Sequence, residues 1–210
     1  MEVERKKIEQ LGIIVLDGSG SMQEPDSSGA TKAASADRAA QDLIRRLQQS
    51  RRRDNFFISV ITYDDKAIIR LEPTPVTNIT QIPSFDPLNG HGGQTNIGGA
   101  LQKAYEVAKG FLRDESSFVR CVVIVLMTDG QHNTGQDPET VVSEIKKSEL
   151  PIKIATVGFG TGDIDVVFLE KIASTTRSDM GGQKMFKLTN NPEELRNFFE
   201  ASVTTSFALG

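Results

Sequence analysis

Small polar residues gather at three separate places along the chain, and all of their side chains offer oxygen atoms. The segment DGSGS places Asp17, Ser19 and Ser21 at alternate positions after an apolar run. Thr95 lies in the glycine-rich segment GHGGQTN, and Asp129 follows a second apolar run. Two carboxylates and three hydroxyls, with no thiol among them, suit a hard divalent cation. These residues therefore predict a site for Mg²⁺, with Mn²⁺ or Ca²⁺ as alternatives.

The predicted site leaves room for a ligand from outside the chain. Mg²⁺ takes six oxygen ligands near octahedral geometry, and the five side chains, some acting through water, fill most of these positions. Two negative charges balance the charge of the ion, and the neutral hydroxyl ligands leave the metal electrophilic. The open position therefore suits an incoming carboxylate. The glycines in DGSGS remove side-chain bulk, so that alternate side chains of a tight loop can point at one centre.

Buried strands and amphipathic helices alternate along the chain around these residues. Apolar runs predict the strands, and apolar residues at helical spacing predict the helices. The expected strands are 11–16, 55–63, 66–71, 120–128, 151–159 and 184–188. The expected helices are 31–49, 97–112, 138–148, 164–174 and 192–207, with Asp137 and Asn191 as N-caps. Segment 72–89 is expected to be mostly loop, because it contains several prolines.

This alternation predicts an α/β fold, Rossmann-like and doubly wound, with a mostly parallel sheet of about six strands and helices on both faces. Segment 66–71 is expected to form one antiparallel edge strand in a hairpin with strand 55–63. Residues 1–210 show no repeat or linker, so we expect one domain with its core at about 7–207. Ligands bind at the carboxyl ends of strands in such a sheet, where the three polar segments lie.

The polar residues resemble the metal-ion-dependent adhesion site of von Willebrand factor type A domains. That family has D-x-S-x-S after the first strand, a threonine before a central helix and an aspartate after the fourth strand. The matching segments here are DGSGS, QTNIGGAL and LMTDG, and the resemblance covers roughly residues 7–207. It implies that Ser19, Ser21 and Thr95 contact the metal directly. It also implies that Asp17 and Asp129 bind the metal directly or through water, and that a partner's glutamate or aspartate completes the shell.

The resemblance implies a non-enzymatic module for protein binding, similar to intracellular bacterial adaptor proteins. Two other classes stay open. An extracellular adhesion or matrix-binding domain is favoured if a signal segment precedes the chain. A metal-assisted phosphohydrolase requires a general base near the metal, whereas we interpret His91 and His132 as exposed loop histidines.

Composition narrows the choice of partners and location. The chain has 210 residues and a formal net charge of −4, which argues against a nucleic-acid binder. The first ten residues, MEVERKKIEQ, contain no apolar signal region, and no apolar stretch is long enough to span a membrane. The single cysteine, Cys121, permits no intrachain disulfide and is expected to be a buried strand thiol. We therefore expect a cytoplasmic protein without nucleic-acid or membrane partners.

Three other features have simpler interpretations. Segment 23–30, QEPDSSGA, is expected to be a solvated flap, although Glu24 and Asp26 could close over the metal. The glycine-rich segment 158–162 matches no complete nucleotide fingerprint. A basic cluster is interpreted as a solvated helix end, with docking of an acidic partner as the alternative. This cluster comprises Arg45, Arg46, Arg51, Arg52 and Arg53.

Overall fold

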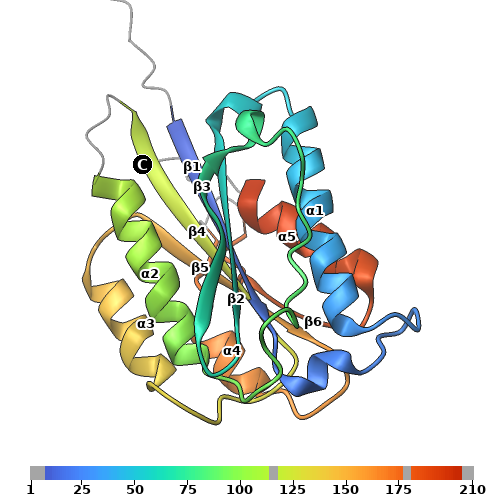
Figure 1. Ribbon diagram of the computed structural model, residues 1–210. Helices are drawn as coiled ribbons and strands as arrows, with labels where there is room; N and C mark the ends of the chain where they lie inside the picture. Colours follow the sequence, from blue (N-terminus) through green and yellow to red (C-terminus); the bar gives the residue numbers. More distant parts are fainter. Residues whose placement is uncertain (1–7, 114–117, 177–180, 205–210) are drawn as a thin grey trace, which may run out of the picture.

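Six strands form one sheet in the order β3-β2-β1-β4-β5-β6 (Figure 1). The computed structural model describes residues 8–113, 118–176 and 181–204. The strands are β1 (Ile8–Asp17), β2 (Phe56–Tyr63), β3 (Ala67–Pro75), β4 (Val119–Thr128), β5 (Ile152–Phe159) and β6 (Phe186–Thr189). The α-helices in the described residues are α1 (Lys32–Gln49), α2 (Ile97–Arg113), α3 (Pro138–Lys147), α4 (Val166–Ile172) and α5 (Pro192–Thr204).

The pairing of the strands confirms the predicted topology. Strand β1 is parallel to both β2 and β4, and β5 and β6 continue the parallel sheet. Among the strands of the described residues, only β3 runs antiparallel, in a hairpin with β2. The strand order reverses between β1 and β4, because β1 connects outward to β2 whereas β4 connects to β5 on the other side. This reversal marks where an open α/β sheet binds ligands.

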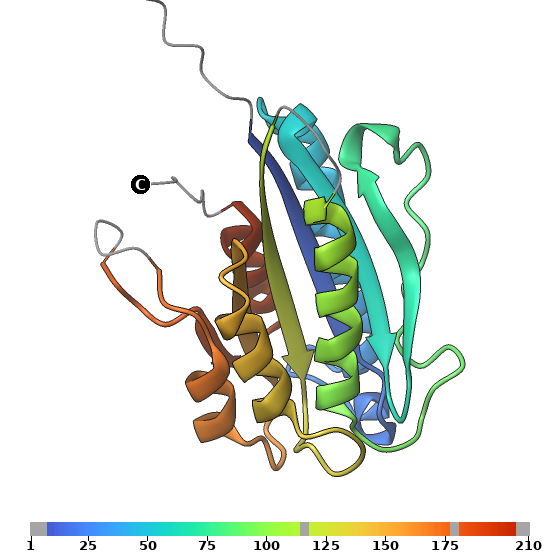
Figure 2. The ribbon, with the colours of Figure 1, turned by 90° about the vertical axis from the view of Figure 1, so that its left-hand side faces the viewer.

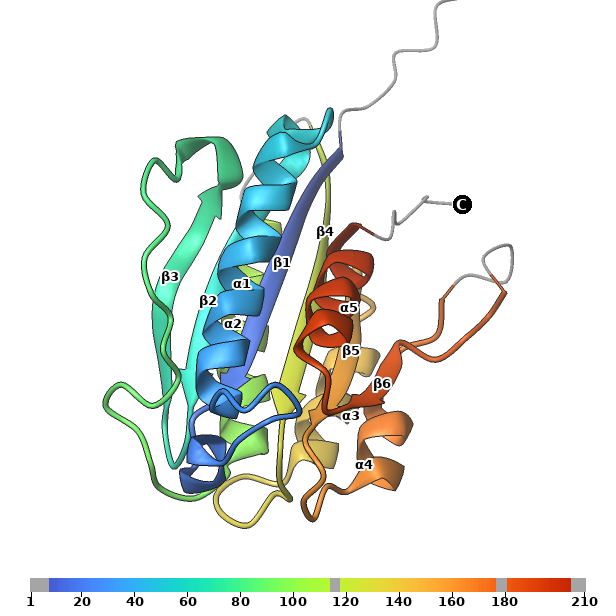
Figure 3. The ribbon, with the colours of Figure 1, turned by 90° about the vertical axis from the view of Figure 1, so that its right-hand side faces the viewer.

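Helices cover both faces of the sheet, and the alternating side chains of β1 pack against both layers. Ile14 and Leu16 belong to the core under α1 and α5, the layer seen in front of the sheet in Figure 3. Ile13 and Val15 belong to the core under α2, α3 and α4, the layer seen in front in Figure 2. Successive strand residues point to opposite faces, so a strand buried on both sides is apolar throughout. The prediction that helices cover both faces of the sheet is confirmed.

The ends of several elements differ from the expected ones. Strand β3 extends to Pro75, so the expectation of a loop was wrong for residues 72–75. An edge strand accepts proline because one side of its backbone needs no ladder partner, and Pro75 pairs with Phe57 at the end of the hairpin. Helix α4 is shorter than the expected 164–174. The expected helix end at 207 and the charged residues 1–7 lie outside the described residues.

The caps and the cysteine agree with the expectations. The side chain of Asp137 accepts hydrogen bonds from the backbone at the start of α3. Asn191 does the same for Glu193 at the start of α5, with an N–O distance of 2.8 Å. Cys121 is buried in β4, and burial raises the pKa of its thiol to about 12. The expected buried strand thiol is therefore confirmed.

Candidate metal centre

The ends of β1 and β4 bring two aspartates to the same edge of the sheet. These strands are parallel neighbours, with Leu16 paired to Met127, so Asp17 and Asp129 follow at adjacent strand ends. Thr95 comes from the loop before α2. That loop is joined to the loop after β4, because the Thr95 amide donates to Asn133 Oδ1 at 2.8 Å and the Asn133 amide donates to the Thr95 carbonyl at 3.2 Å.

The DGSGS loop turns sharply because of its backbone bonds and its first glycine. Asp17 Oδ1 accepts a hydrogen bond from the Ser19 amide at 2.8 Å, which forms a local turn. The Gly18 amide donates to the Tyr63 carbonyl at 2.6 Å. A Cβ atom on Gly18 would lie 2.1 Å from the carbonyl oxygen of Pro87, so no larger residue fits here. The short 3₁₀ turn η1 (Gly20–Gln23) follows.

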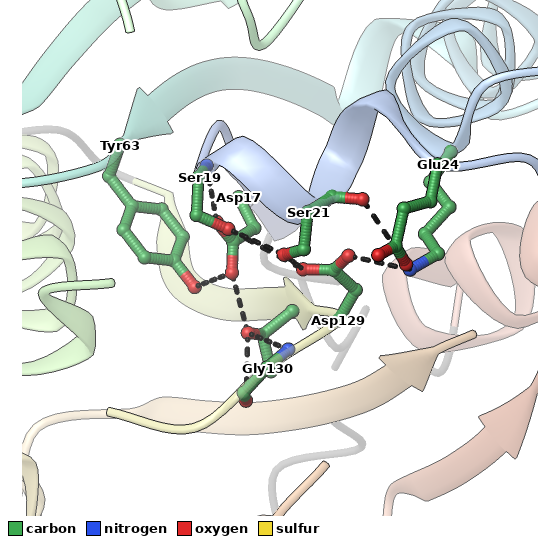
Figure 4. Close-up of polar contacts among 9 residues, drawn as sticks. Asp17, Ser19, Ser21, Glu24, Tyr63, Asp129 and Gly130 are labelled. Carbon is green, nitrogen blue, oxygen red and sulfur yellow. Dashed lines mark hydrogen bonds and ion pairs between the residues drawn. The ribbon is translucent and has the colours of Figure 1, made fainter. Parts of the chain in front are cut away.

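The serine side chains of this loop point to Asp129 and not to the backbone of the next turn. Ser19 stands at the N-cap of η1, yet its side chain makes no capping bond. The Ser21 hydroxyl donates to Asp129 Oδ1 at 2.8 Å, and the Ser19 hydroxyl lies 3.5 Å from the same oxygen. The two hydroxyl oxygens are 3.2 Å apart (Figure 4). The Ser19 side chain therefore does not cap the turn η1.

These separations suit the ligand shell of a small cation. Adjacent ligands around an octahedral Mg²⁺ at about 2.1 Å lie about 3.0 Å from one another. The three oxygen–oxygen distances among Ser19, Ser21 and Asp129 are 2.8, 3.2 and 3.5 Å. The described residues contain no group of three or more His, Cys, Asp or Glu side chains that could hold a metal. Hydroxyl groups therefore have to supply part of any ligand set here, as the sequence predicts.

Asp17 is the most confined carboxylate of the group. Its side chain is fully buried, and Oδ2 accepts hydrogen bonds from the Thr128 hydroxyl at 2.6 Å and the Tyr63 hydroxyl at 3.2 Å. Burial, and then repulsion from Asp129, raise the pKa of Asp17 to about 6. Burial also raises the pKa of Tyr63 well above its ordinary value, so that its hydroxyl stays a donor. A cation between the two aspartates would relieve their repulsion.

Lys32, which is not one of the five predicted ligands, contacts the same cluster. Its ammonium group lies 2.8 Å from Asp129 Oδ2 and 2.7 Å from Glu24 Oε2. Burial lowers the pKa of Lys32, but its bonds to Asp129 and Glu24 outweigh that effect and raise it. A lysine in the first turn of a helix opposes the helix dipole. This unfavourable position at the start of α1 was the signal in the sequence that could have identified it.

The flap at 23–30 is solvated only in part. Most of its residues are exposed, but Asp26 is buried. Asp26 accepts bonds from the Ser28 amide at 2.8 Å and the Ser28 hydroxyl at 2.7 Å, and also from the Ser35 hydroxyl. The expectation was therefore wrong for Asp26, which stabilises the turn. Glu24 is the flap carboxylate that pairs with Lys32 beside the cluster.

The interpretation of His91 as an exposed histidine was wrong. Its side chain is fully buried, with Nδ1 2.7 Å from Asp64 Oδ1 and Nε2 2.9 Å from the Thr62 hydroxyl. His132 is half-buried. His91 is held by these two partners at the end of β2, so it is not a free base for hydrolysis.

An open pocket of about 390 Å³ lies over the cluster. The loop after β5, where the sequence resembles part of a nucleotide fingerprint, contributes Gly162 and Asp163 to its rim. The other lining residues come from η1, the flap, α1, the Thr95 loop and the loop after β4. They are Ser21, Glu24, Lys32, Thr95, Asp129, Gly130, Gln131 and Asn133. Three of the five predicted ligands therefore line the pocket, and the buried Asp17 and Ser19 lie behind them.

An α/β sheet with converging oxygen groups at the point of strand reversal defines the class of protein. The profile of the von Willebrand factor type A domain matches residues 13–201, and the chain belongs to this family. Domains of this family generally mediate protein–protein interaction, and some of them depend on a metal. Over 131 residues the chain is 30% identical to the uncharacterized protein YfbK of Escherichia coli (strain K12). That match covers 60% of this chain and 21% of YfbK, so the chain spans about a fifth of that relative.

Solved structures share the fold at low sequence identity. Proximal thread matrix protein 1 from the mussel byssus, solved with a zinc-occupied metal site motif, has a TM-score of 0.64 and 23% identity. The match covers 94% of this chain and 45% of the mussel chain. The PilB minor pilin from Streptococcus sanguinis has a TM-score of 0.67 and 16% identity, over 98% of this chain and 64% of the pilin. These likenesses show the fold alone.

The remaining sequence features lie away from the pocket. Arg45 pairs with Asp42 at 2.7 Å, and Arg46 pairs with Glu200 of α5, at the end of α1 opposite to the flap. These pairs agree with a solvated helix end.

No helix in the described part of the chain has the length and apolar character needed to span a bilayer.

Proposed function

We propose that this chain is a metal-dependent module that binds an acidic side chain of a partner protein. In this proposal Asp17, Ser19, Ser21, Thr95 and Asp129 hold Mg²⁺, or Mn²⁺ or Ca²⁺ in its place. The metal supplies an electrophilic position that a glutamate or aspartate of the partner occupies. The chain performs no covalent chemistry.

The observation that carries the proposal is the convergence on Asp129 Oδ1. Two serine hydroxyls reach this one oxygen from a loop that starts 112 residues earlier in the chain, at distances of 2.8 and 3.5 Å. Neither serine uses its hydroxyl for a backbone cap in the described residues. Turns and caps therefore do not account for this arrangement, and converging oxygen groups of this kind are what a bound hard cation would require.

Thr95 supports the proposal from the third segment. It is 4% exposed, and both hydrogen bonds that it forms in the described residues are made by its backbone, to Asn133. Its hydroxyl faces the loop after β4, where a Cβ atom on Gly130 would lie 4.0 Å away. Asn133 therefore fixes the loop, and the hydroxyl remains available to a metal in the pocket.

A phosphohydrolase is less well supported. Such an enzyme requires a general base beside the metal, and the ring of His91 is enclosed by Asp64 and Thr62. The mussel protein that was solved with zinc supports a divalent ion at this kind of site. The role of a bacterial adaptor in the cytoplasm stays a prediction, since a minor pilin shares the fold.

Affinity capture with and without the metal tests the proposal. We expect a partner to be retained by the wild type in Mg²⁺, released by EDTA, and not retained by Thr95→Ala. Thr95→Ser, which keeps the hydroxyl, is the matched control and should retain the partner. Replacement of the partner's contacting glutamate by glutamine should abolish binding. Equal capture in Mg²⁺ and EDTA would refute the proposal.

A further inference from the structure

Lys32 is built into the floor of the pocket. Its side chain is 3% exposed, and its ammonium group contacts two carboxylates and lies 3.5 Å from the Ser21 carbonyl. Gly160, at the end of β5, has a φ of +141°. A Cβ atom there would lie 3.1 Å from Lys32 Cε and 3.3 Å from Nζ. The glycine thus leaves room for the lysine stem, and the buried cation is a fixed part of the site.

The two carboxylates that Lys32 contacts differ in their freedom. The side chain of Asp129 is fully buried, and its other oxygen faces the serine hydroxyls. The side chain of Glu24 is 63% exposed and lies on the flap. Two hydrogen bonds hold the Glu24 backbone. The Glu24 amide donates to the Ser21 carbonyl at 3.0 Å, and the Lys32 amide donates to the Glu24 carbonyl at 2.9 Å. Glu24 can therefore swing its carboxylate away while the flap keeps its place.

Charge explains why one exchangeable carboxylate belongs here. Asp17 and Asp129 contribute two buried negative charges, whereas a divalent ion and Lys32 contribute three positive ones. The remaining positive charge requires one further anion, since a buried charge without a partner is unfavourable. In the resting chain Glu24 supplies it, at 2.7 Å from Lys32 Nζ.

We infer that Lys32 is the second cation of the binding site and that Glu24 occupies the place of the partner's carboxylate until the partner binds. This inference rests on the proposed function. One oxygen of the incoming carboxylate contacts the metal, and the other replaces Glu24 on the lysine ammonium. Lys32 is then a specificity-determining residue that selects a carboxylate over a neutral oxygen ligand.

Acetate, the smallest carboxylate, serves as the probe. Its binding to the chain at saturating Mg²⁺ can be followed through the backbone amide resonances of Gly130 and Gly162, which line the pocket. Glu24→Gln removes the internal competitor, so acetate should bind about threefold more tightly than to wild type. Lys32→Met removes the second cation, so acetate should bind about tenfold more weakly. The Mg²⁺ affinity of each variant is measured first.

An exposed ion pair of the same kind provides the matched control. Lys171 lies 2.7 Å from Glu139, and both side chains are at least half exposed. Lys171→Met and Glu139→Gln should leave the acetate affinity unchanged. If Lys32→Met does not fold, the acetate affinity of Glu24→Gln tests the inference without it. An acetate affinity of Glu24→Gln equal to that of the wild type overturns the inference.

The outcomes separate this inference from the function on which it rests. If acetate binds equally to the wild type, Glu24→Gln and Lys32→Met, but only in Mg²⁺, the inference is wrong and the metal-dependent function stands. If Mg²⁺ binds and acetate binds no variant, both are overturned. If Mg²⁺ does not bind the wild type, the proposed function fails, and the inference fails with it.

Discussion

Replacement of Asp17 by asparagine should stabilise the metal-free chain at neutral pH. Asp17 is fully buried, and burial and the charge of Asp129 raise its pKa from 3.8 to about 6. At about 1.36 kcal/mol per pH unit, this difference amounts to about 3 kcal/mol against the charged form. The asparagine keeps a carbonyl oxygen for the Ser19 amide, and the hydroxyls of Thr128 and Tyr63 can rotate to accept from its amide group. We expect a net gain of about 1 to 3 kcal/mol, because weaker hydrogen bonds offset part of the difference.

The raised pKa of Asp17 fixes how the free energy of unfolding of the wild type changes with pH. The Asp17 carboxyl binds its proton more tightly in the folded chain than in the unfolded chain. Its favourable contribution is therefore fully present below about pH 3.8 and is lost as the pH rises through about 6. The advantage of Asp17→Asn over wild type should accordingly grow between pH 4.5 and 7.5. Urea unfolding in EDTA, at several pH values across this window, measures it.

An exposed carboxylate at the pocket rim gives the control. Asp163 is exposed, so Asp163→Asn should change the free energy of unfolding by less than about 0.5 kcal/mol at every pH. In saturating Mg²⁺ the order should reverse, because the ion stabilises the wild type by binding only its folded form. An advantage of Asp17→Asn that is absent, or that does not vary with pH, refutes the view that two like charges are held together here.

Three further predictions concern the scaffold of the site. Gly18→Ala should destabilise the chain by about 1 to 3 kcal/mol in urea unfolding, because its Cβ atom would meet the Pro87 carbonyl at 2.1 Å; a smaller loss would show that the loop can move. Asp26→Ala should cost about 1 to 3 kcal/mol, since Ser28 and Ser35 lose a buried acceptor, whereas an unchanged midpoint would mean that the flap does not depend on it. Cys121 should react with a thiol reagent only on unfolding, and rapid labelling of the native chain would contradict its burial.

The sheet could be predicted because buried parallel strands have an unambiguous pattern. Strands such as β4 are apolar on both faces, and the polar segments at their ends mark the carboxyl edge. The extension of β3 to Pro75 could not be predicted in this way, because an edge strand is polar and tolerates proline. Local caps such as Asp137 were predictable because their partners lie within four residues.

The polar contacts across long sequence distances were out of reach. Lys32 meets Asp129 across 97 residues, and its unfavourable position in the first turn of α1 marks the lysine as unusual without indicating Asp129 as its partner. His91 was expected to be an exposed loop residue, since glycines flank it in the sequence. Its ring is instead enclosed between Thr62, near the end of β2, and Asp64, in the turn that follows. Sequence patterns therefore gave the oxygen groups at the strand ends but not the cation beside them.

The most direct test of the metal centre is a Mn²⁺ titration followed by electron paramagnetic resonance. The wild type and Thr95→Ser should each bind one Mn²⁺ per chain with similar affinity, because both keep the hydroxyl. Thr95→Ala should bind at least about tenfold more weakly, as loss of a ligand or its support usually does. Its free energy of unfolding in EDTA should match wild type, since the contacts of Thr95 with Asn133 are made by the backbone. Equal Mn²⁺ affinity in wild type and Thr95→Ala, or no binding by the wild type, would contradict the account.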